Sequence, residues 1–291
     1  MTRRWSRRSA RATRPPLPAM ATVGTAQPSS GFAQSMPAAF VAGSAIGVLG
    51  GLIGLGGAEF RLPLLIGLFG FAALQAVILN KAMSLIVVAT ALPARLFAVP
   101  FSQVSGGWDI VLNLLAGSLI GAWLGASWAI RMRTGTLYKV LAGLLVLIAA
   151  ALTLNHLGTV EPLDLPLAAQ IPAGVLTGVL IGIVAAVMGV AGGELLIPTI
   201  VLLYATDIKT AGSLSLAVSL PTMLVAFARY SRDGSFQVLH SNIRFVLTMA
   251  AGSVLGAVLG GLLLGIVPAD AVIPVLVVIL LVSAVKVGRH R

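Results

Sequence analysis

The sequence predicts an all-α membrane protein, a polytopic bundle of transmembrane helices built from two four-element repeats. Hydrophobic residues make up 58% of the 291 positions and charged residues only 9%, whereas soluble domains carry charge on about a quarter of their residues. Uncharged runs of about 20 residues, the length needed to cross a bilayer, recur along the chain. These runs are continuous rather than alternating in polarity, which excludes a closed β-barrel.

A glycine-rich motif that occurs twice indicates a duplicated unit. The string GLGGAEFRLP at residues 54–63 aligns with GVAGGELLIP at residues 189–198, and each copy combines small residues, one glutamate and one proline. Two matches at one offset favour a repeat over chance composition. The second match aligns two glycine stripes, each a row of glycines four residues apart, at the same offset along the chain. Their members are Gly117, Gly121 and Gly125 in the first half and Gly252, Gly256 and Gly260 in the second.

The apolar runs divide each half into four elements. They cover about residues 36–70, 74–100, 110–130 and 137–157 in the first half, and about 171–204, 208–229, 243–267 and 270–288 in the second. The predicted domains are a basic tail at 1–35, membrane repeat 1 at 36–157, an extracytoplasmic linker at 158–170 and membrane repeat 2 at 171–291. The tail is rich in Arg, Ser, Thr and Pro, which predicts disorder.

The first element of each half is predicted to break at its glycine motif. The crowded small residues do not resist unwinding, and a proline four residues after each glutamate fits the first turn of a new half-helix. Free N–H groups at a helix start bind anions, so the sequence predicts two facing anion-binding sites. The motif residues are Gly54, Gly56, Gly57 and Pro63 in the first copy and Gly189, Gly192, Gly193 and Pro198 in the second.

Polar residues on the second elements extend the candidate substrate site. Asn80 and Ser84 are four residues apart, as are Ser215 and Ser219, so each pair shares a helix face. The alternative is that the serines hydrogen-bond their own helix. The full candidate set for substrate binding is Gly56, Gly57, Glu59, Arg61, Asn80, Lys81, Ser84, Gly192, Gly193, Glu194, Ser215 and Ser219.

The motif glutamates, Glu59 and Glu194, are the strongest candidates for functional residues. A carboxylate deep in a membrane is expensive, so it faces a cavity or a partner and commonly serves transport or proton relay. Protonation would relieve competition between these carboxylates and an anionic substrate for the free N–H groups, which predicts proton coupling at both residues. The alternative is structural, with Glu59 capping its half-helix or pairing with Arg61 or Lys81.

The third elements are predicted to be scaffold, because their glycine stripes have the four-residue spacing of close helix packing. Cations at the ends of the apolar runs predict the orientation. The positive-inside rule places both termini and the loops before residues 137 and 243 in the cytoplasm, and residues 155–170 outside. Eight plain crossings are incompatible with these placements of the termini and loops. An inverted repeat agrees with all of them when each broken first element enters the membrane and returns on the same side, which leaves three crossings per half. Eight plain spans remain the alternative.

Several classes of function are disfavoured by the residues. The net charge of +11 sits mainly in the tail and at the ends of apolar runs, which indicates membrane anchoring rather than nucleic-acid binding. Cysteine is absent, so thiolate metal sites and disulfides are ruled out. No catalytic motif and no metal-binding set is found, so we expect neither an enzyme nor a cofactor.

The two glycine strings with their following prolines, and the two four-element halves, resemble the sulfite/organosulfonate exporter (TauE/SafE-like) permeases. The resemblance covers about residues 36–288 and implies transport of small sulfur-containing anions across the bacterial inner membrane. Glu59 and Glu194 stand where such strings more usually continue with apolar residues.

Together these observations predict a secondary transporter for a small anion such as sulfite or a sulfonate, possessing proton coupling and embedded in the lipid bilayer. The alternatives are an anion channel, since a re-entrant segment can also line a filter, and a transporter of another small solute.

Overall fold

The computed structural model describes residues 35–53, 56–98, 106–156, 162–163, 165–263 and 269–290. Within these ranges the chain forms helices and no strand, which confirms the all-α prediction. Gly54, almost all of the predicted disordered tail, and part of the predicted linker lie outside the described residues.

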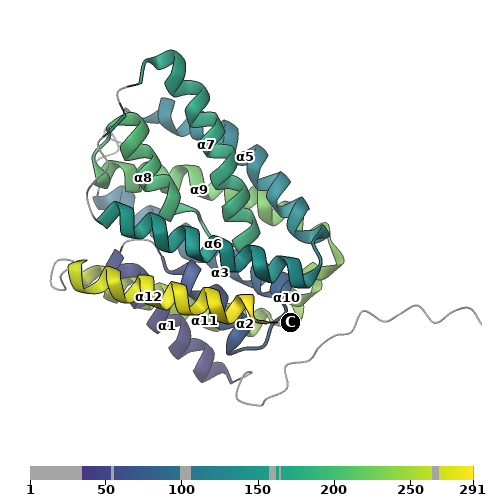
Figure 1. The fold of residues 1–291 in the computed structure, drawn as a ribbon. Helices are drawn as coiled ribbons and strands as arrows, with labels where there is room; N and C mark the ends of the chain where they lie inside the picture. Colours follow the sequence, from purple (N-terminus) through teal and green to yellow (C-terminus); the bar gives the residue numbers. More distant parts are fainter. Residues whose placement is uncertain are drawn as a thin grey trace, which may run out of the picture.

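Helices fill both halves of the chain (Figure 1). Among the described residues, six helices are long and apolar enough to cross a membrane, namely α3, α5, α6, α7, α9 and α11. In the first half the helices are α1 (Met36–Ile53), α2 (Ala58–Gly67), α3 (Ala73–Ala98), α5 (Trp108–Arg131) and α6 (Thr134–His156). In the second half they are α7 (Leu167–Met188), α8 (Gly193–Tyr204), α9 (Ile208–Tyr230), the 3₁₀ turn η1 (Gly234–Phe236), α10 (Gln237–Ser241), α11 (Ile243–Leu262) and α12 (Ala269–Gly288).

The helix is interrupted at both glycine motifs. Gly56 and Gly57 have φ of 81° and 70°, and Gly189 and Gly192 have φ of 71° and 88°. L-residues rarely adopt this left-handed region, so glycine is what allows the chain to leave one helix and begin the next within a few residues. Pro63 and Pro198 lie in the second turns of α2 and α8 rather than in the first turns that the sequence predicted, because each half-helix begins directly after the last left-handed glycine.

In the first half, the chain returns in α2 to the end of the bundle where α1 began. Thr248 near the start of α11 contacts Met36 at the start of α1. Phe69 and Phe71, which follow α2, pack their rings on Phe245 of the same part of α11, with centroids 4.9 and 5.5 Å away. The start of α1 and the end of α2 therefore both lie beside the first turns of α11.

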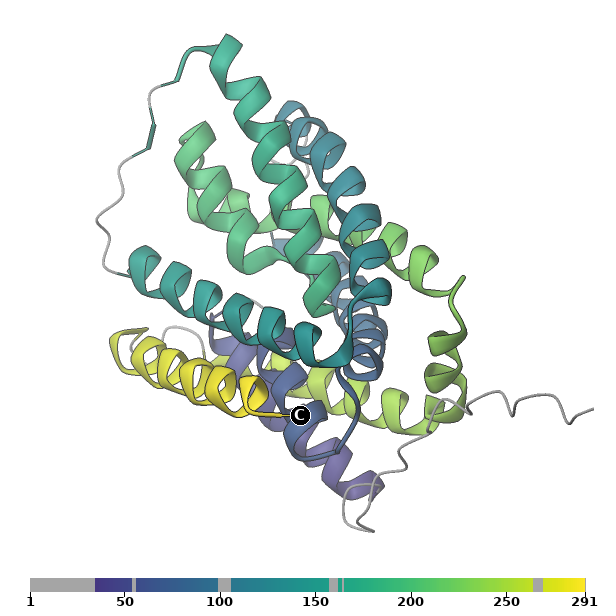
Figure 2. The same cartoon turned by 45° about the vertical axis from the view of Figure 1, so that its right-hand side comes forward.

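The second half doubles back at the opposite end of the bundle, where α8 runs back alongside α7 (Figure 2). Asn113 in the early turns of α5 donates a hydrogen bond of 2.8 Å to the Tyr204 hydroxyl at the end of α8. Gln170, in the first turn of α7, donates to the carbonyl of Leu203. We call this end of the bundle the far end.

Cations gather at the end of the bundle where α1 begins, which we call the basic end. His290 after α12 packs on Tyr138 in the early turns of α6, and Lys286 lies beside Gly67 at the end of α2. The Arg229 guanidinium at the end of α9 donates to Ser127 of α5 at 2.7 Å. The cations carried by these helix ends are Arg131, Arg133, Lys139, Arg229, Arg232, Arg244, Lys286 and Arg289.

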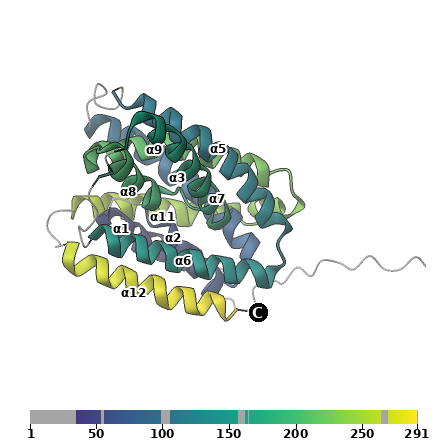
Figure 3. The same ribbon diagram turned by 45° about the horizontal axis from the view of Figure 1, so that its top comes forward.

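The most extensive helix packing exchanges elements between the halves. α1 packs on α11, and α7 packs on α5, so the first element of each half lies against the third element of the other. The fourth elements, α6 and α12, lie side by side at one edge (Figure 3). A side chain placed at Gly121 would strike the backbone of Val179, and one at Gly256 would strike the backbone of Ser44. The predicted glycine stripes are thus points of close backbone approach.

The start of α7 and the loop before α11 differ from the sequence expectation. α7 begins at Leu167, because Pro166 in an extended conformation occupies the N-cap, so the last residues of the predicted linker are helical. The loop between α9 and α11 contains η1 and α10. The sequence did not predict these two elements, because the loop is short and mixes polar with apolar residues. Asp207 caps α9 by accepting hydrogen bonds from the backbone N–H groups of Lys209 and Thr210. The Thr210 hydroxyl, followed by these N–H groups, lowers the pKa of this exposed carboxyl.

The arrangement of helix ends predicts which surface positions face the same side of a membrane. Gly234 lies at the basic end and Leu163 at the far end, and both are exposed. The chain contains no cysteine of its own. In intact cells, an impermeant maleimide should label a Leu163→Cys variant and leave a Gly234→Cys variant unlabelled until the membrane is opened. Labelling of Gly234→Cys from outside would contradict a cytoplasmic basic end.

Candidate functional site

The two half-helix starts bring the motif glutamates into the interior. Gly57 and Gly192, both in the left-handed conformation, occupy the N-caps of α2 and α8, and neither has a side chain to cap the helix. Glu59 and Glu194 follow in the first turns and are 0% and 4% exposed. The unwound glycines therefore place a carboxyl group at the start of each half-helix, beside the N–H groups of its first turn.

The two carboxyl groups meet each other across the halves. No side-chain oxygen of Glu59 or Glu194 has a well-formed hydrogen bond to another group in the part of the chain that the structure describes. The donor that acts on each carboxyl is the backbone N–H of the same glutamate. The two carboxyls nevertheless lie within hydrogen-bonding range of one another. Since carboxylates only accept hydrogen bonds, such a bond forms only when one of the two carries a proton.

Arg61 offers unused hydrogen-bond donors to the same region. Its side chain is 0% exposed, and only Nη1 has a partner, the Ser84 hydroxyl at 3.5 Å. Nε and Nη2 are buried without an acceptor. Arg61 also acts electrostatically on Glu59. A buried guanidinium with free N–H groups is suited to hold the oxygens of a small anion, because its donors form a planar fork.

Lys81 and Asn80 on α3 hold the interrupted segment after α7. The Lys81 ammonium donates to the carbonyls of Ala185 at 2.8 Å and Val190 at 2.6 Å. Asn80 donates to the carbonyls of Ala58 at 3.0 Å and Met188 at 3.2 Å. Asn80 therefore ties the start of α2 to the end of α7. Lys81 supplies a donor to the Val190 carbonyl beyond the helix break and a further one to the Ala185 carbonyl, which also accepts from the Val190 N–H.

The serines of the second elements divide into different environments. Ser84 accepts from Arg61, whereas Ser215 donates to the carbonyl of Gly212 in its own helix at 2.8 Å. The Ser219 hydroxyl is buried without a partner. Ser215 and Ser219 follow Asn80 and Ser84 by the same offset that separates the glycine motifs. This ungapped match was available in the sequence and places all four on equivalent helix faces.

Sequence reasoning missed several polar residues that support the site. The buried Tyr230 hydroxyl donates to the carbonyl of Ala186 at 3.0 Å, near the carbonyls that Lys81 binds. Ser118 and Thr222 join α5 to α9 through a 2.7 Å hydrogen bond. A tyrosine at the end of an apolar helix and a threonine within one give no signal of partners that lie far away in the chain.

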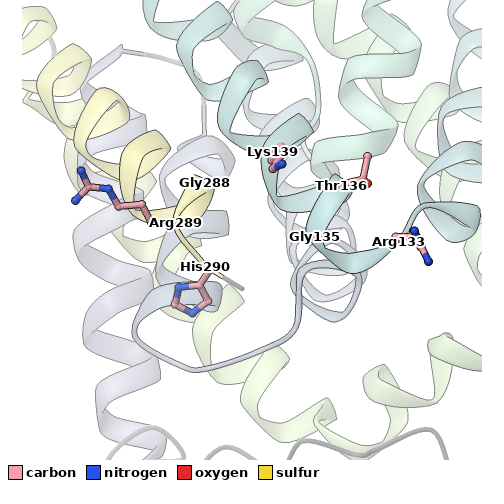
Figure 4. A pocket seen from close by; sticks show the side chains of 7 residues that line it. All are labelled: Arg133, Gly135, Thr136, Lys139, Gly288, Arg289 and His290. Carbon is pink, nitrogen blue, oxygen red and sulfur yellow. The ribbon is translucent and has the colours of Figure 1, made fainter.

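A pocket of about 770 Å³ opens at the basic end (Figure 4), and none of the buried charged residues lines it. It lies between the start of α6 and the end of α12, so it is a surface feature of that end. Its lining residues are Arg133, Gly135, Thr136, Lys139, Gly288, Arg289 and His290. Among the described residues, no three acidic or histidine side chains come together in a group able to hold a metal ion.

Comparison with known proteins identifies one family. A family model described as Sulfite exporter TauE/SafE matches residues 3–152 and 162–290. No curated protein and no solved structure matches the chain. The family match spans both halves, which confirms the resemblance found in the glycine motifs.

The contacts of Lys81 predict a structural effect that can be separated from an effect on transport. Lys81→Met keeps an apolar stem but leaves the Val190 carbonyl without a donor, at a cost of about 1–3 kcal/mol. The Ala185 carbonyl keeps the hydrogen bond from the Val190 N–H. We expect a clear fall in the thermal unfolding temperature of the detergent-solubilised protein, and no such fall for Lys209→Met, which changes an exposed lysine. A Lys81→Met variant as stable as the parent would show that these two bonds do not hold the break.

Proposed function

The chain belongs to the sulfite exporter TauE/SafE family and is a multi-pass membrane transporter, and from that premise we propose that it is a secondary carrier for a small sulfur-containing anion, sulfite or a sulfonate. The proposed site lies between the starts of α2 and α8. Its anion contacts are Arg61, the N–H groups that follow Gly56, Gly57, Gly192 and Gly193, and the polar groups of Ser84 and Ser219.

The observation that carries this proposal is the buried Arg61 guanidinium with Nε and Nη2 unpartnered. Leaving charged donors unpaired in an apolar interior is expensive, so a group that accepts from them is expected in at least one state of the transport cycle. Sulfite and sulfonates present several oxygens on one sulfur, which matches a planar fork of N–H donors. Lys81 has its own carbonyl partners, so we assign it to positioning the break.

A carrier fits the packing better than an open channel. Glu59, Arg61, Lys81, Asn80 and Glu194 are at most 4% exposed. A cluster closed to both ends corresponds to an occluded state, which alternating access requires and a continuous pore does not. The orientation that we propose has both termini and the basic end in the cytoplasm, with the protein in the cell's inner membrane.

We further propose that Glu59 and Glu194 couple transport to protons. Both lie next to the N–H groups at a half-helix start, where a carboxylate competes with an anionic substrate. Protonation removes that competition, so proton and anion occupancy are linked. The structural alternative is that the glutamates only stabilise the two helix starts.

Anion selectivity tests the proposed site. In reconstituted vesicles we expect saturable flux of sulfite or a short sulfonate, and none of sodium or neutral sugars. Arg61→Lys keeps the charge and loses the planar fork, so KM should rise roughly 10- to 100-fold, the equivalent of a charge-assisted hydrogen bond. Arg289→Lys, at the basic end, should transport like the parent. Flux of neutral solutes or cations alone would refute the assignment.

A pH gradient tests the coupling. Glu59→Gln and Glu194→Gln should insert and fold, because the amide keeps the size and removes a costly buried charge. Each variant should lose the flux that a pH gradient drives while retaining anion exchange. Asp109→Asn removes an exposed carboxyl and should keep coupled flux. If both Gln variants respond to pH as the parent does, the glutamates are structural and coupling lies elsewhere.

A further inference from the structure

We propose that Glu59 and Glu194 bind a single proton between them, in a hydrogen bond that joins the two half-helices. This deepens the proposed coupling and rests on it for the proton's role in transport. Its structural basis is separate, since it comes from the contacts of four buried oxygens. The unit of coupling is then the pair of carboxyls, one from each half, rather than two independent acids.

The first step is the state without a proton. Both side chains are buried, and among the described residues none of their four oxygens has a well-formed hydrogen bond to another group. Two carboxylates would repel each other within hydrogen-bonding range, with no donor near them beyond the backbone N–H of each glutamate. The buried arrangement is inconsistent with a pair that carries two negative charges.

The second step is the state with two protons. The charged groups that face the pair are Arg61 on α2, which acts on Glu59, and Lys81 on α3, which acts on Glu194. From α9, the Tyr230 hydroxyl is directed to the Ala186 carbonyl instead. Two neutral carboxyls would leave Arg61 and Lys81 buried without any opposing charge, which is also costly.

One shared proton satisfies both conditions. The protonated carboxyl donates its O–H to the other carboxylate. Pairs of adjacent carboxyl groups hold one proton in this way, because two negative charges so close together repel each other. One negative charge remains to oppose the two cations. The proton enters from the water on the side where the site opens, lies between one oxygen of each glutamate, and leaves to water on the other side.

The shared proton also determines whether proton binding favours or opposes the binding of the anionic substrate. Removing one negative charge beside Arg61 strengthens the attraction for an anion, so anion and proton bind the same state. Linkage is reciprocal, so anion binding equally favours proton binding. One pair with one proton gives one proton for each anion carried.

The test measures thermal unfolding of the purified full-length protein in detergent across a pH series. When pH rises and the shared proton leaves, two buried carboxylates face each other, so the parent's unfolding temperature should fall. In Glu59→Gln or Glu194→Gln the amide N–H donates to the remaining carboxylate at any pH. Each single variant, and the double variant, should therefore lose the whole of this fall. Asp109→Asn should keep the parent's profile.

Two results would overturn the proposal. If each single variant loses only part of the fall and the double variant loses all of it, the glutamates titrate independently. If all three variants keep the parent's profile, the pair holds no proton.

A second measurement counts protons through ligand affinity. Methanesulfonate stays ionised over the pH range used, so its own titration does not interfere. Its affinity should weaken by at most tenfold for each unit rise in pH when one proton is linked, and a steeper change would contradict the shared proton. Absence of methanesulfonate binding at every pH would count against the proposed anion site and leave the unfolding result to decide on the pair.

Discussion

Interrupting a helix inside an apolar bundle frees backbone groups that no water can satisfy, and this constraint organises the interior. At the break after α7, the carbonyls of Met188 and Val190 are bound by Asn80 and Lys81 of α3. The carbonyls of Ala185 and Ala186 accept backbone N–H groups, and Lys81 and Tyr230 add a second donor to each. The same break leaves N–H groups at the start of α8, where Glu194 lies. The polar residues Asn80 and Lys81 of α3 thus serve mainly to hydrogen-bond backbone carbonyls. Among the described residues, the buried donors that remain without a partner, chiefly those of Arg61, are free to bind a ligand.

The two halves share the glycine motif and the pairing of a first element with a third element, whereas their buried charged residues differ. Each half supplies one motif glutamate, and each first element packs on the other half's third element. Both buried cations come from the first half, since Leu196 and Leu216 stand at the positions equivalent to Arg61 and Lys81. A cavity opening toward one end therefore exposes a different surface from a cavity opening toward the other. In the carrier that we propose, the affinity for the anion would therefore differ between the two faces of the membrane.

The sequence predicted the helices well, because a long apolar run has few alternatives in a membrane. The motif glycines and prolines also indicated where α1 and α7 end, since they affect the local backbone directly. The contacts within the site were out of reach of this reasoning. That Glu59 and Glu194 meet, that Lys81 reaches the Val190 carbonyl, and that Tyr230 takes part all depend on how distant helices pack. Local pattern and spacing carry no information about such long-range pairs.

The packing of α1 on α11 has a consequence for how the chain is made. The ribosome delivers α1 to the membrane first, yet the helix whose backbone it must approach emerges only after most of the chain has been translated. At synthesis rates of roughly 5–20 residues per second, α1 waits on the order of ten seconds or more for its partner. Its glycine face meanwhile lies against lipid or the insertion machinery, so assembly of the two halves is a late, concerted event rather than the docking of one finished domain onto another.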